Sequence, residues 1–393
     1  MRRVVILLTI STVLLLGTIS AWAGALTVPN TFVSGQKALA SEVNANFNEV
    51  ESQVTDNAND IAVNVSDIAT NASDISAAAT SVTDHESRIA TLESTITTLL
   101  NTVNLLTAKL AYMDVDNSST LNGLAPPHVI FTGANIHVQN GSSQSDTANG
   151  VGNLIIGYNE IGLADSTNRA GSHNVIIGEE HEYTSFGGLV AGYNNKVYSE
   201  NSSVSGGRNN IASGLYASVS GGLANNASGS WASVSGGHDN LASIDFASVS
   251  GGQNNLASGF YASVSGGYSN KATSNGASVS GGVGNTASSP NASVSGGKDN
   301  EASGSYASVS GGQDNLASGT YASVSGGQNN LASGTFASSV SGGQDNIASG
   351  LYASVSGGYT NSASGNSSVV SGGYLGTASS GYDWVAGGLF QDD

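Results

Sequence analysis

The sequence predicts a fibrous α + β protein, in which an N-terminal parallel coiled coil is followed by a C-terminal parallel β-solenoid of 15-residue rungs. Three observations support this prediction. Apolar residues recur every seven positions from residue 54, a unit of 15 residues fills most of the second half, and none of the 393 residues is a cysteine that could cross-link a compact fold. A fixed repeat is typical of stacked units, each of which buries its apolar face against its neighbours.

Residues 1–23 have the features of a secretory signal peptide. Two arginines precede the apolar run 4–16, and Ala21-Trp22-Ala23 forms a small-x-small cleavage site. The run is shorter than the roughly 18 residues that a membrane anchor needs, so we expect cleavage before Gly24 and no membrane span in the mature chain. The expected location is therefore secreted, extracellular or on a bacterial cell surface.

The charge balance is strongly acidic. Removal of the two N-terminal arginines leaves 8 basic against 28 acidic residues, a net charge of −20. Nucleic acids and anionic membrane surfaces are bound by basic patches, so we expect no nucleic-acid partner.

A coiled-coil stalk is predicted over residues 43–114, after a non-helical lead over 24–42. In sevens from residue 54, the first heptad position, a, is aliphatic nine times without a break. Its members are Val54, Ile61, Ile68, Ile75, Val82, Ile89, Ile96, Val103 and Leu110. Such a series is typical of a coiled coil, and Ile or Val at a with Leu at d favours two strands.

The fourth heptad position, d, divides this stalk into two halves. The C-terminal half carries Leu92, Leu99, Leu106 and Met113, and the N-terminal half carries Asn57, Asn64, Asn71, Ala78 and His85. Buried amides weaken a coiled coil but penalise wrong registers and strand numbers. The polar members either specify the register or hold water or an anion between chains, and Asn57, Asn64, Asn71 and His85 are the candidate axial positions.

A junction with short strands is expected over residues 115–150. Pro126-Pro127 interrupts the helical pattern, and "HVIFTG" and "NIHVQNG" predict short strands. "DVDNSS" lacks the glycine and the closing glutamate of a calcium loop, so no metal is expected there.

Regular solenoid rungs are predicted over residues 204–393, and diverged early rungs over 151–203. In "ASVSGG" alanine and valine share one parity and serine the other, which predicts a half-buried strand with small interior groups. The glycine pair supplies a tight turn, and "NxASGxY" supplies a second strand and bend. The spacing is 15 residues except for 16 between Val324 and Val340, where a serine is inserted. One asparagine per rung predicts a structural ladder of stacked amides.

Two columns of the repeat vary, and they are the candidate interaction stripe. The position after the ladder asparagine mixes aliphatic residues with lysine and glutamate, and the position that closes the rung is mostly aromatic. The stripe comprises Leu241, Leu256, Leu316, Leu331, Tyr216, Trp231, Tyr261, Tyr306, Tyr321 and Tyr352. The aromatic rings either stack over the bends or contact a glycan or protein.

The units "ASVSGG" and "NxASG" resemble the head repeats of trimeric autotransporter adhesins, and the asparagines at d resemble the stalk motif of that family. The resemblance implies left-handed β-roll coils packed as a homotrimer, an axial anion held by three chains, and attachment from a bacterial surface. It favours a trimer over the dimer that the a and d residues favour. This chain has a longer repeat, has glycine in place of isoleucine, and places the stalk before the head; no C-terminal membrane anchor is expected.

No catalytic residue, cofactor or metal ligand is predicted. The serines are periodic and therefore structural, and Asp239, Asp299, Asp314 and Asp345 share one turn column. The one irregular cluster comprises His173, Glu179, Glu180, His181 and Glu182, for which a solvated turn is favoured over a metal or ligand site.

The sequence thus predicts a non-enzymatic fibrous protein for attachment or surface structure. Its expected partners are copies of itself and a host or surface glycan or protein. Two alternatives remain open. One is ice or mineral binding through serine columns such as Ser248 and Ser250, and the other is a tailspike-like enzyme that processes glycans.

Overall fold

A computed structural model describes residues 26–161 and 168–387. The chain divides into two units, Met1–Ala134 and Asn135–Asp393, which are described separately. No helix in the described ranges is long and apolar enough to cross a membrane. The predicted signal peptide lies outside the described residues.

In the described part of the first unit, residues 26–134, the chain forms the helix α1 (Ala40–Lys109), which is 70 residues long. No residue of α1 is buried, and the a positions Val54, Ile61 and Ile75 expose 61%, 63% and 70% of their surface. The lead folds back on the start of the helix, where the Asn30 backbone N–H donates to Asn46 Oδ1 (2.8 Å) and Asn46 Nδ2 donates to the Asn30 carbonyl (2.7 Å). Long helices in water are stabilised mainly by packing of an apolar face, and in the described residues the apolar seam of α1 stays exposed.

The helix ends before the predicted stalk does. Leu110 caps α1, and Met113, expected in the last d position, instead begins strand β1 (Met113–Asp116). This strand pairs antiparallel with β2 (His128–Phe131), which brings Met113 opposite Phe131. The strand expected in "HVIFTG" is β2. The strand expected in "NIHVQNG" does not form.

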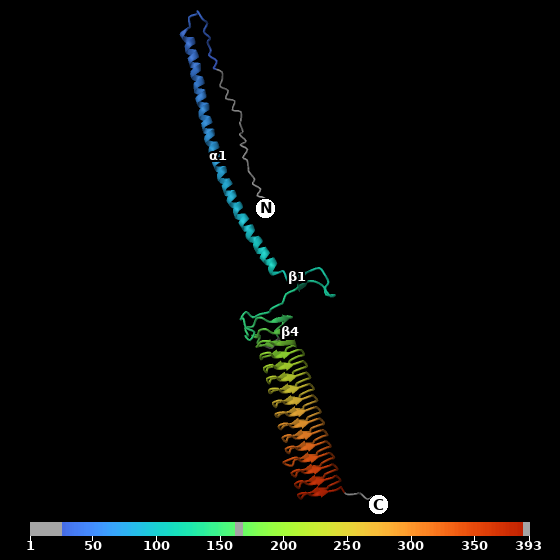
Figure 1. Ribbon diagram of the computed structural model, residues 1–393. Coiled ribbons are helices and arrows are strands. Elements are labelled where there is room, and N and C mark those ends of the chain that lie inside the picture. The colour runs from blue at the N-terminus through green and yellow to red at the C-terminus, as the bar shows by residue number, and fades with distance from the viewer. Residues whose placement is uncertain (1–25, 162–167, 388–393) are drawn as a thin grey trace. The chain divides into compact units, whose positions relative to one another are not determined.

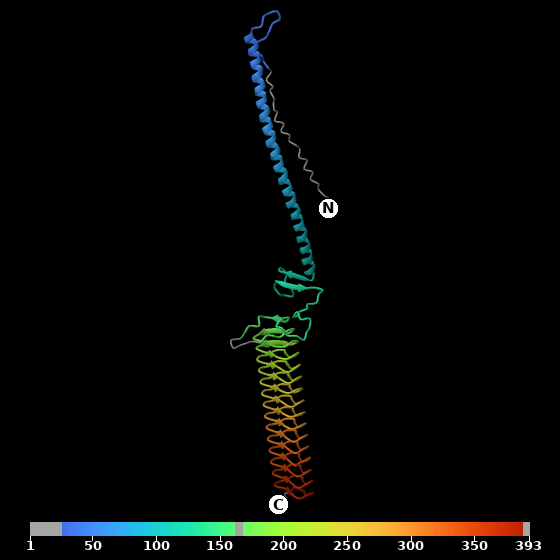
Figure 2. The same ribbon diagram turned by 90° about the vertical axis from the view of Figure 1, so that its left-hand side faces the viewer.

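The second unit confirms the predicted parallel β-solenoid of 15-residue rungs. Each regular rung contributes one strand to a 16-stranded sheet and one to a 14-stranded sheet, and both sheets are parallel throughout (Figures 1 and 2). Identical repeat positions pair between rungs, so Val249 lies between Val234 and Val264.

The larger sheet begins with the longer strands β3 (Leu154–Ile156), β4 (Val175–Glu179) and β6 (Leu189–Tyr193). It continues with β8 (Ser203–Val204), β10 (Ser218–Val219), β12 (Ser233–Val234), β14 (Ser248–Val249), β16 (Ser263–Val264), β18 (Ser278–Val279), β20 (Ser293–Val294), β22 (Ser308–Val309), β24 (Ser323–Val324), β26 (Ser339–Val340), β28 (Ser354–Val355), β30 (Val369–Val370) and β32 (Trp384–Val385).

The smaller sheet is built of two-residue strands. They are β5 (Glu182–Tyr183), β7 (Lys196–Val197), β9 (Ile211–Ala212), β11 (Asn226–Ala227), β13 (Leu241–Ala242), β15 (Leu256–Ala257), β17 (Lys271–Ala272), β19 (Thr286–Ala287), β21 (Glu301–Ala302), β23 (Leu316–Ala317), β25 (Leu331–Ala332), β27 (Ile347–Ala348), β29 (Ser362–Ala363) and β31 (Thr377–Ala378).

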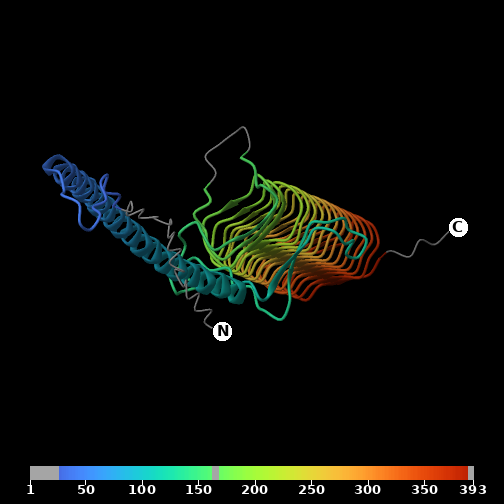
Figure 3. The ribbon, with the colours of Figure 1, turned by 90° about the horizontal axis from the view of Figure 1, so that it is seen from above.

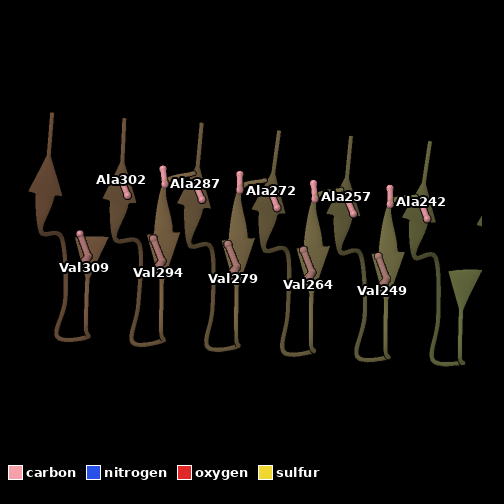
Figure 4. Packing of buried hydrophobic residues seen from close by; sticks show 14 of the residues in the cluster. Ala242, Val249, Ala257, Val264, Ala272, Val279, Ala287, Val294, Ala302 and Val309 are labelled. Atoms are coloured by element: carbon pink, nitrogen blue, oxygen red, sulfur yellow. The ribbon is translucent and has the colours of Figure 1, made fainter. Parts of the chain in front are cut away.

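The core of the solenoid is made of small side chains. In each regular rung an alanine and a valine of the larger sheet and an alanine of the smaller sheet are buried, as for Ala247, Val249 and Ala257. Figure 4 shows the valine column and the alanine column facing the interior from the two rows of strands. Small interior residues let the two sheets approach closely, and the rungs seen from above repeat one narrow outline (Figure 3).

The solenoid keeps its parallel strand pairing in two places where the repeat is irregular, the early rungs and the 16-residue rung. The early rungs place Ile176 and Val190 in the valine column, both fully buried, and Ile155 pairs with Ile176 at the edge. The 16-residue spacing is taken up at a bend, because Ala337 has a φ of 51° and Ser338 takes the buried alanine position. Val324 therefore still pairs with Val340.

Candidate interaction surface

The asparagine column has the structural role that the sequence predicts, although its hydrogen bonds differ from a stack of paired amides. The Asn255 N–H donates to Asn240 Oδ1 (3.0 Å), while Asn255 Nδ2 donates to the carbonyls of Gly251 (2.9 Å) and Gly267 (3.0 Å). The side chain of Asn255 therefore joins its own rung to the next rung, and the side chain of Asn240 joins the preceding rung to the Asn255 backbone in the same way. Because Asn255 is 1% exposed and its amide is already bonded, the ladder offers nothing to a ligand.

The second glycine of each pair is required by the stacking. Gly252 has a φ of +82°, and a Cβ there would overlap the Gly267 carbonyl oxygen, whereas Gly251 faces open space. The invariant part of the repeat is thus explained by rung-to-rung contact, and candidate functional residues must be sought in the outer columns.

The first outer column lies on the smaller sheet, directly after the ladder asparagine. The predicted stripe members Leu241, Leu256, Leu316 and Leu331 are all half-buried there and face outwards. Leu241 pairs with Leu256, and Leu316 pairs with Leu331. Exposed Lys271 and Glu301 interrupt the column between the two pairs, so the structure does not join the four leucines into one stripe.

The second outer column holds the aromatic residues that close the rungs. Tyr216, Trp231, Tyr261, Tyr306, Tyr321 and Tyr352 have φ values of 55–59° and expose 47–58% of their surface. Their rings form two contiguous rows, which also include Phe246 and Phe336. The first row is stacked throughout, whereas in the second row Tyr306 and Tyr321 are stacked and Phe336 meets its two neighbours edge to face. Centroid distances are 5.6, 5.0 and 4.7 Å along Tyr216, Trp231, Phe246 and Tyr261, and 4.9, 5.1 and 5.6 Å along Tyr306, Tyr321, Phe336 and Tyr352.

The contacts between rings cover part of each ring and leave the rest exposed. The structure therefore shows rings packed over the bends, and contact of the exposed ring surface with a glycan or protein stays a prediction. Phe260, which the sequence analysis did not select, packs edge-on against Phe246 and Tyr261 at 5.5 and 4.5 Å. Its position is not aromatic in neighbouring rungs, so periodicity gave no signal for it.

Both outer columns are interrupted over the same rungs. Gly276 and Asn291 replace the aromatic residues in the rungs that carry Lys271 and Thr286. The surface thus has a first apolar block, residues 211–261, and a second apolar block, residues 306–352, with a polar segment between them. This division is visible only when the two columns are aligned rung by rung.

The outward serines form a further regular surface, on the larger sheet. Ser248 is half-buried and Ser250 exposed, and their counterparts in the next rung, Ser263 and Ser265, repeat this pattern. The rows are spaced by one strand separation, about 4.8 Å. They form an even array of hydroxyl groups.

The candidate axial residues of the stalk, Asn57, Asn64, Asn71 and His85, all lie on α1 with exposed side chains. Within one chain the helix brings none of the four near another, because successive members are seven or more residues apart. A site made from them would need several chains.

The irregular cluster is not the solvated turn that the sequence predicts, because His181 is fully buried. Burial lowers the pKa of His181 below its ordinary value. Glu182 accepts hydrogen bonds from Lys196 Nζ and the Tyr198 hydroxyl, both at 2.8 Å, and its bond raises the pKa of Lys196. In residues 26–161 and 168–387, no three histidine or acidic side chains are arranged to hold a metal ion.

The chain matches no protein-family model and no curated protein sequence. The resemblance to trimeric autotransporter adhesins therefore rests on the repeat residues and on the asparagines at d. What the structure adds to it is the parallel solenoid of 15-residue rungs.

Proposed function

We propose that this chain is a secreted or cell-surface fibrous protein without enzymatic activity, which serves attachment or surface structure. The observation that carries the proposal is that, within each rung, the residues that hold the stack together are separate from those that face solvent. Buried alanine, valine and asparagine hold the stack together, whereas the apolar and aromatic side chains that vary face solvent in two blocks. Exposed aromatic surface of this kind is typical of sites that contact proteins or glycans.

Self-assembly through α1 is part of the proposal. The exposed a positions form a continuous apolar seam that only a helix of the same period can cover. A parallel arrangement places Asn57, Asn64 and Asn71 beside their own copies, whereas an antiparallel one would place these amides against the leucine-rich half. We favour three chains, as the resemblance to trimeric autotransporter adhesins implies, with the amides around an axial anion or water.

Light scattering on the purified protein tests this assembly. We expect a particle of three chains, each of 39.1 kDa before signal removal, and a helical circular dichroism signal that melts at a concentration-dependent temperature. A monomer at micromolar concentration would contradict the proposed self-assembly.

Binding of the labelled chain to arrays of glycans and surface proteins tests attachment. The triple variant Y216S/W231S/Y261S removes three rings of the first apolar block and should weaken a positive signal roughly tenfold or more, as expected for aromatic anchors. The control S218A/S233A/S248A changes the same rungs on the larger sheet and should bind normally. Equal binding by both variants would exclude the aromatic column as the contact surface.

A second candidate function, ice or mineral binding, is favoured by the in-register serine rows of the larger sheet. Threonine is the usual residue for such a face, and serine presents the hydroxyl without the methyl group. Thermal hysteresis in the presence of the full chain measures this activity directly, and its absence would remove ice binding.

A further inference from the structure

The asparagine ladder is replaced by a histidine at one point near the N-terminal end of the solenoid. His181 lies 14 residues before Asn195, in the same turn of the preceding rung, and both are fully buried. The Asn195 N–H donates to His181 Nδ1 (3.2 Å), just as the Asn210 N–H donates to Asn195 Oδ1 (2.8 Å). The imidazole thus takes over the ladder bond of an amide.

The second ring nitrogen also follows the amide pattern. His181 Nε2 lies 3.0 Å from the Ile177 carbonyl, four residues back, and Asn195 Nδ2 donates to the Ala191 carbonyl at the same offset. Nδ1 must therefore be the acceptor and Nε2–H the donor, which is the neutral ring with one proton. The rung before it continues the ladder, because the His181 N–H donates to Asn159 Oδ1 (2.8 Å).

Burial opposes a positive charge on the His181 ring, and it outweighs the hydrogen bonds to the Ile177, Asn195 and Gly192 backbones, which favour one. Arg169 is the cation next to the ring, with Nε donating to the His181 carbonyl (3.2 Å) and Nη2 donating to the Glu160 carbonyl (3.0 Å). The neighbouring acids are engaged elsewhere, since Glu180 accepts from the Tyr193 hydroxyl and Glu182 accepts from Lys196. No carboxylate in the described residues is hydrogen-bonded to the imidazole.

We propose that His181 makes the early rungs of the solenoid acid-labile, so that its protonation releases the segment before β6 while the asparagine-laddered rungs stay folded. A proton on Nδ1 would face the Asn195 N–H (3.2 Å), so the ladder bond would be lost, and the acceptor left for that proton is the more distant Asn195 carbonyl (3.4 Å). An amide cannot be protonated in this range, so the regular rungs lack this sensitivity.

The direction of the pH dependence follows from burial, which lowers the pKa of His181 in the folded state below 6.5. The unfolded early rungs then bind the proton more tightly than the folded ones. Their stability is complete above pH 6.5 and falls as the pH drops below it, by up to tenfold in the opening equilibrium per pH unit. At pH 5, opening should increase by up to roughly thirtyfold.

Hydrogen exchange of the full chain at pH 7.5 and pH 5, expressed as protection factors, tests the proposal. Peptides from residues 150–200 of the wild type should lose protection at pH 5, while peptides from 204–385 keep it. The variant H181N restores the asparagine and should keep protection at both pH values. The control H238N removes an exposed histidine of a regular rung, paired with Asp239 at 3.1 Å, and should behave as the wild type.

Two outcomes would overturn the proposal. If H181N loses as much protection at pH 5 as the wild type does, the effect belongs to another group, such as the flanking Glu180 and Glu182 or the nearest other histidine, His173. Unchanged protection of the wild type at pH 5 would show that no acid-labile segment exists. Should H181N not fold, histidine NMR of the wild-type chain decides, since a charged His181 ring in a protected early rung contradicts the proposal equally.

Discussion

At the scale of the residue, the ladder asparagine is the most constrained side chain of the repeat. Asn255 accepts one backbone hydrogen bond from the next rung and donates two to glycine carbonyls. The variant N255A would remove the partners of the Asn270 N–H and the Gly251 carbonyl, whereas the Gly267 carbonyl would keep the hydrogen bond from the Gln253 N–H (2.9 Å). We expect it to destabilise its rungs by about 2–4 kcal/mol, because each unsatisfied buried group costs about 1–3 kcal/mol.

Local protection from hydrogen exchange in residues 235–285 measures this effect. The exposed neighbour Gln253 provides the control Q253A, which should change stability by less than about 0.5 kcal/mol. Similar losses in the two variants would mean that the ladder is not the source of the rung-to-rung stability.

Three serines, Ser202, Ser338 and Ser368, occupy the buried position that alanine holds in the other regular rungs. Ser338 and Ser368 are fully buried, and their hydroxyl groups have no hydrogen-bond partner. S338A and S368A should each stabilise the chain by roughly 1 kcal/mol, because a buried hydroxyl is left unsatisfied. Ser202 is the matched control, since its hydroxyl donates to the Ser199 carbonyl (2.7 Å), and S202A should not stabilise. Thermal or urea midpoints decide, and a gain in all three variants would refute the argument.

At the scale of the element, the bend after the aromatic residue tolerates an extra residue and the strand does not. The chain itself shows this, because the 16-residue rung keeps Val324 paired with Val340. One alanine inserted after Tyr261 should therefore be accepted with a loss of no more than about 1 kcal/mol, because it takes over the left-handed position that Tyr261 already occupies, as Ala337 does after Phe336.

The comparison is an alanine inserted between Ser263 and Val264. It would turn the rest of the strand to the opposite face, and we expect loss of protection in the flanking rungs, because side chains alternate along a strand. Hydrogen exchange on both insertions checks the pair, and equal tolerance would contradict the account of the bend.

The stalk helix provides the second prediction at this scale. Replacing Asn57, Asn64 and Asn71 together by leucine should raise the melting temperature of the assembled stalk, because amides at d reduce the stability of a coiled coil. The same change should broaden the distribution of oligomeric states measured by sedimentation. A single sharp species like that of the wild type would mean that these amides do not specify strand number.

How far the sequence predicts the fold differs between elements. Periodicity predicts the rungs, the small core and the ladder, because each of these repeats. It places Met113 wrongly, since the a and d pattern continues past Lys109 while pairing of β1 with β2 ends the helix. It also misplaces His181, because an imidazole among acidic residues resembles a surface turn until the 14-residue offset to Asn195 is recognised.

At the scale of the whole molecule, the solenoid is modular. Its rungs contact only their neighbours, so a deletion of two whole rungs, residues 265–294, should leave a shorter array that joins the two apolar blocks. Tyr261 would then lie one rung from Tyr306, and the ring stack would become continuous, which near-ultraviolet circular dichroism detects. Deletion of 265–293 is the control, because it breaks the rung length, and preserved protection in that variant would contradict the modular description.

The uniformity of the ladder has a consequence for how the chain finds its fold. If a segment slipped by one complete unit, nearly every hydrogen bond between rungs would form again. The regular repeats alone therefore do not specify which rung pairs with which. The irregular rungs specify the pairing that the regular ones leave open. The 14-residue step from His181 to Asn195 allows one pairing near the start of the ladder, and the 16-residue rung that contains Ala337 allows one pairing further along. Mispaired arrays should therefore multiply during refolding when the extra residue is removed, although the finished array would gain in regularity.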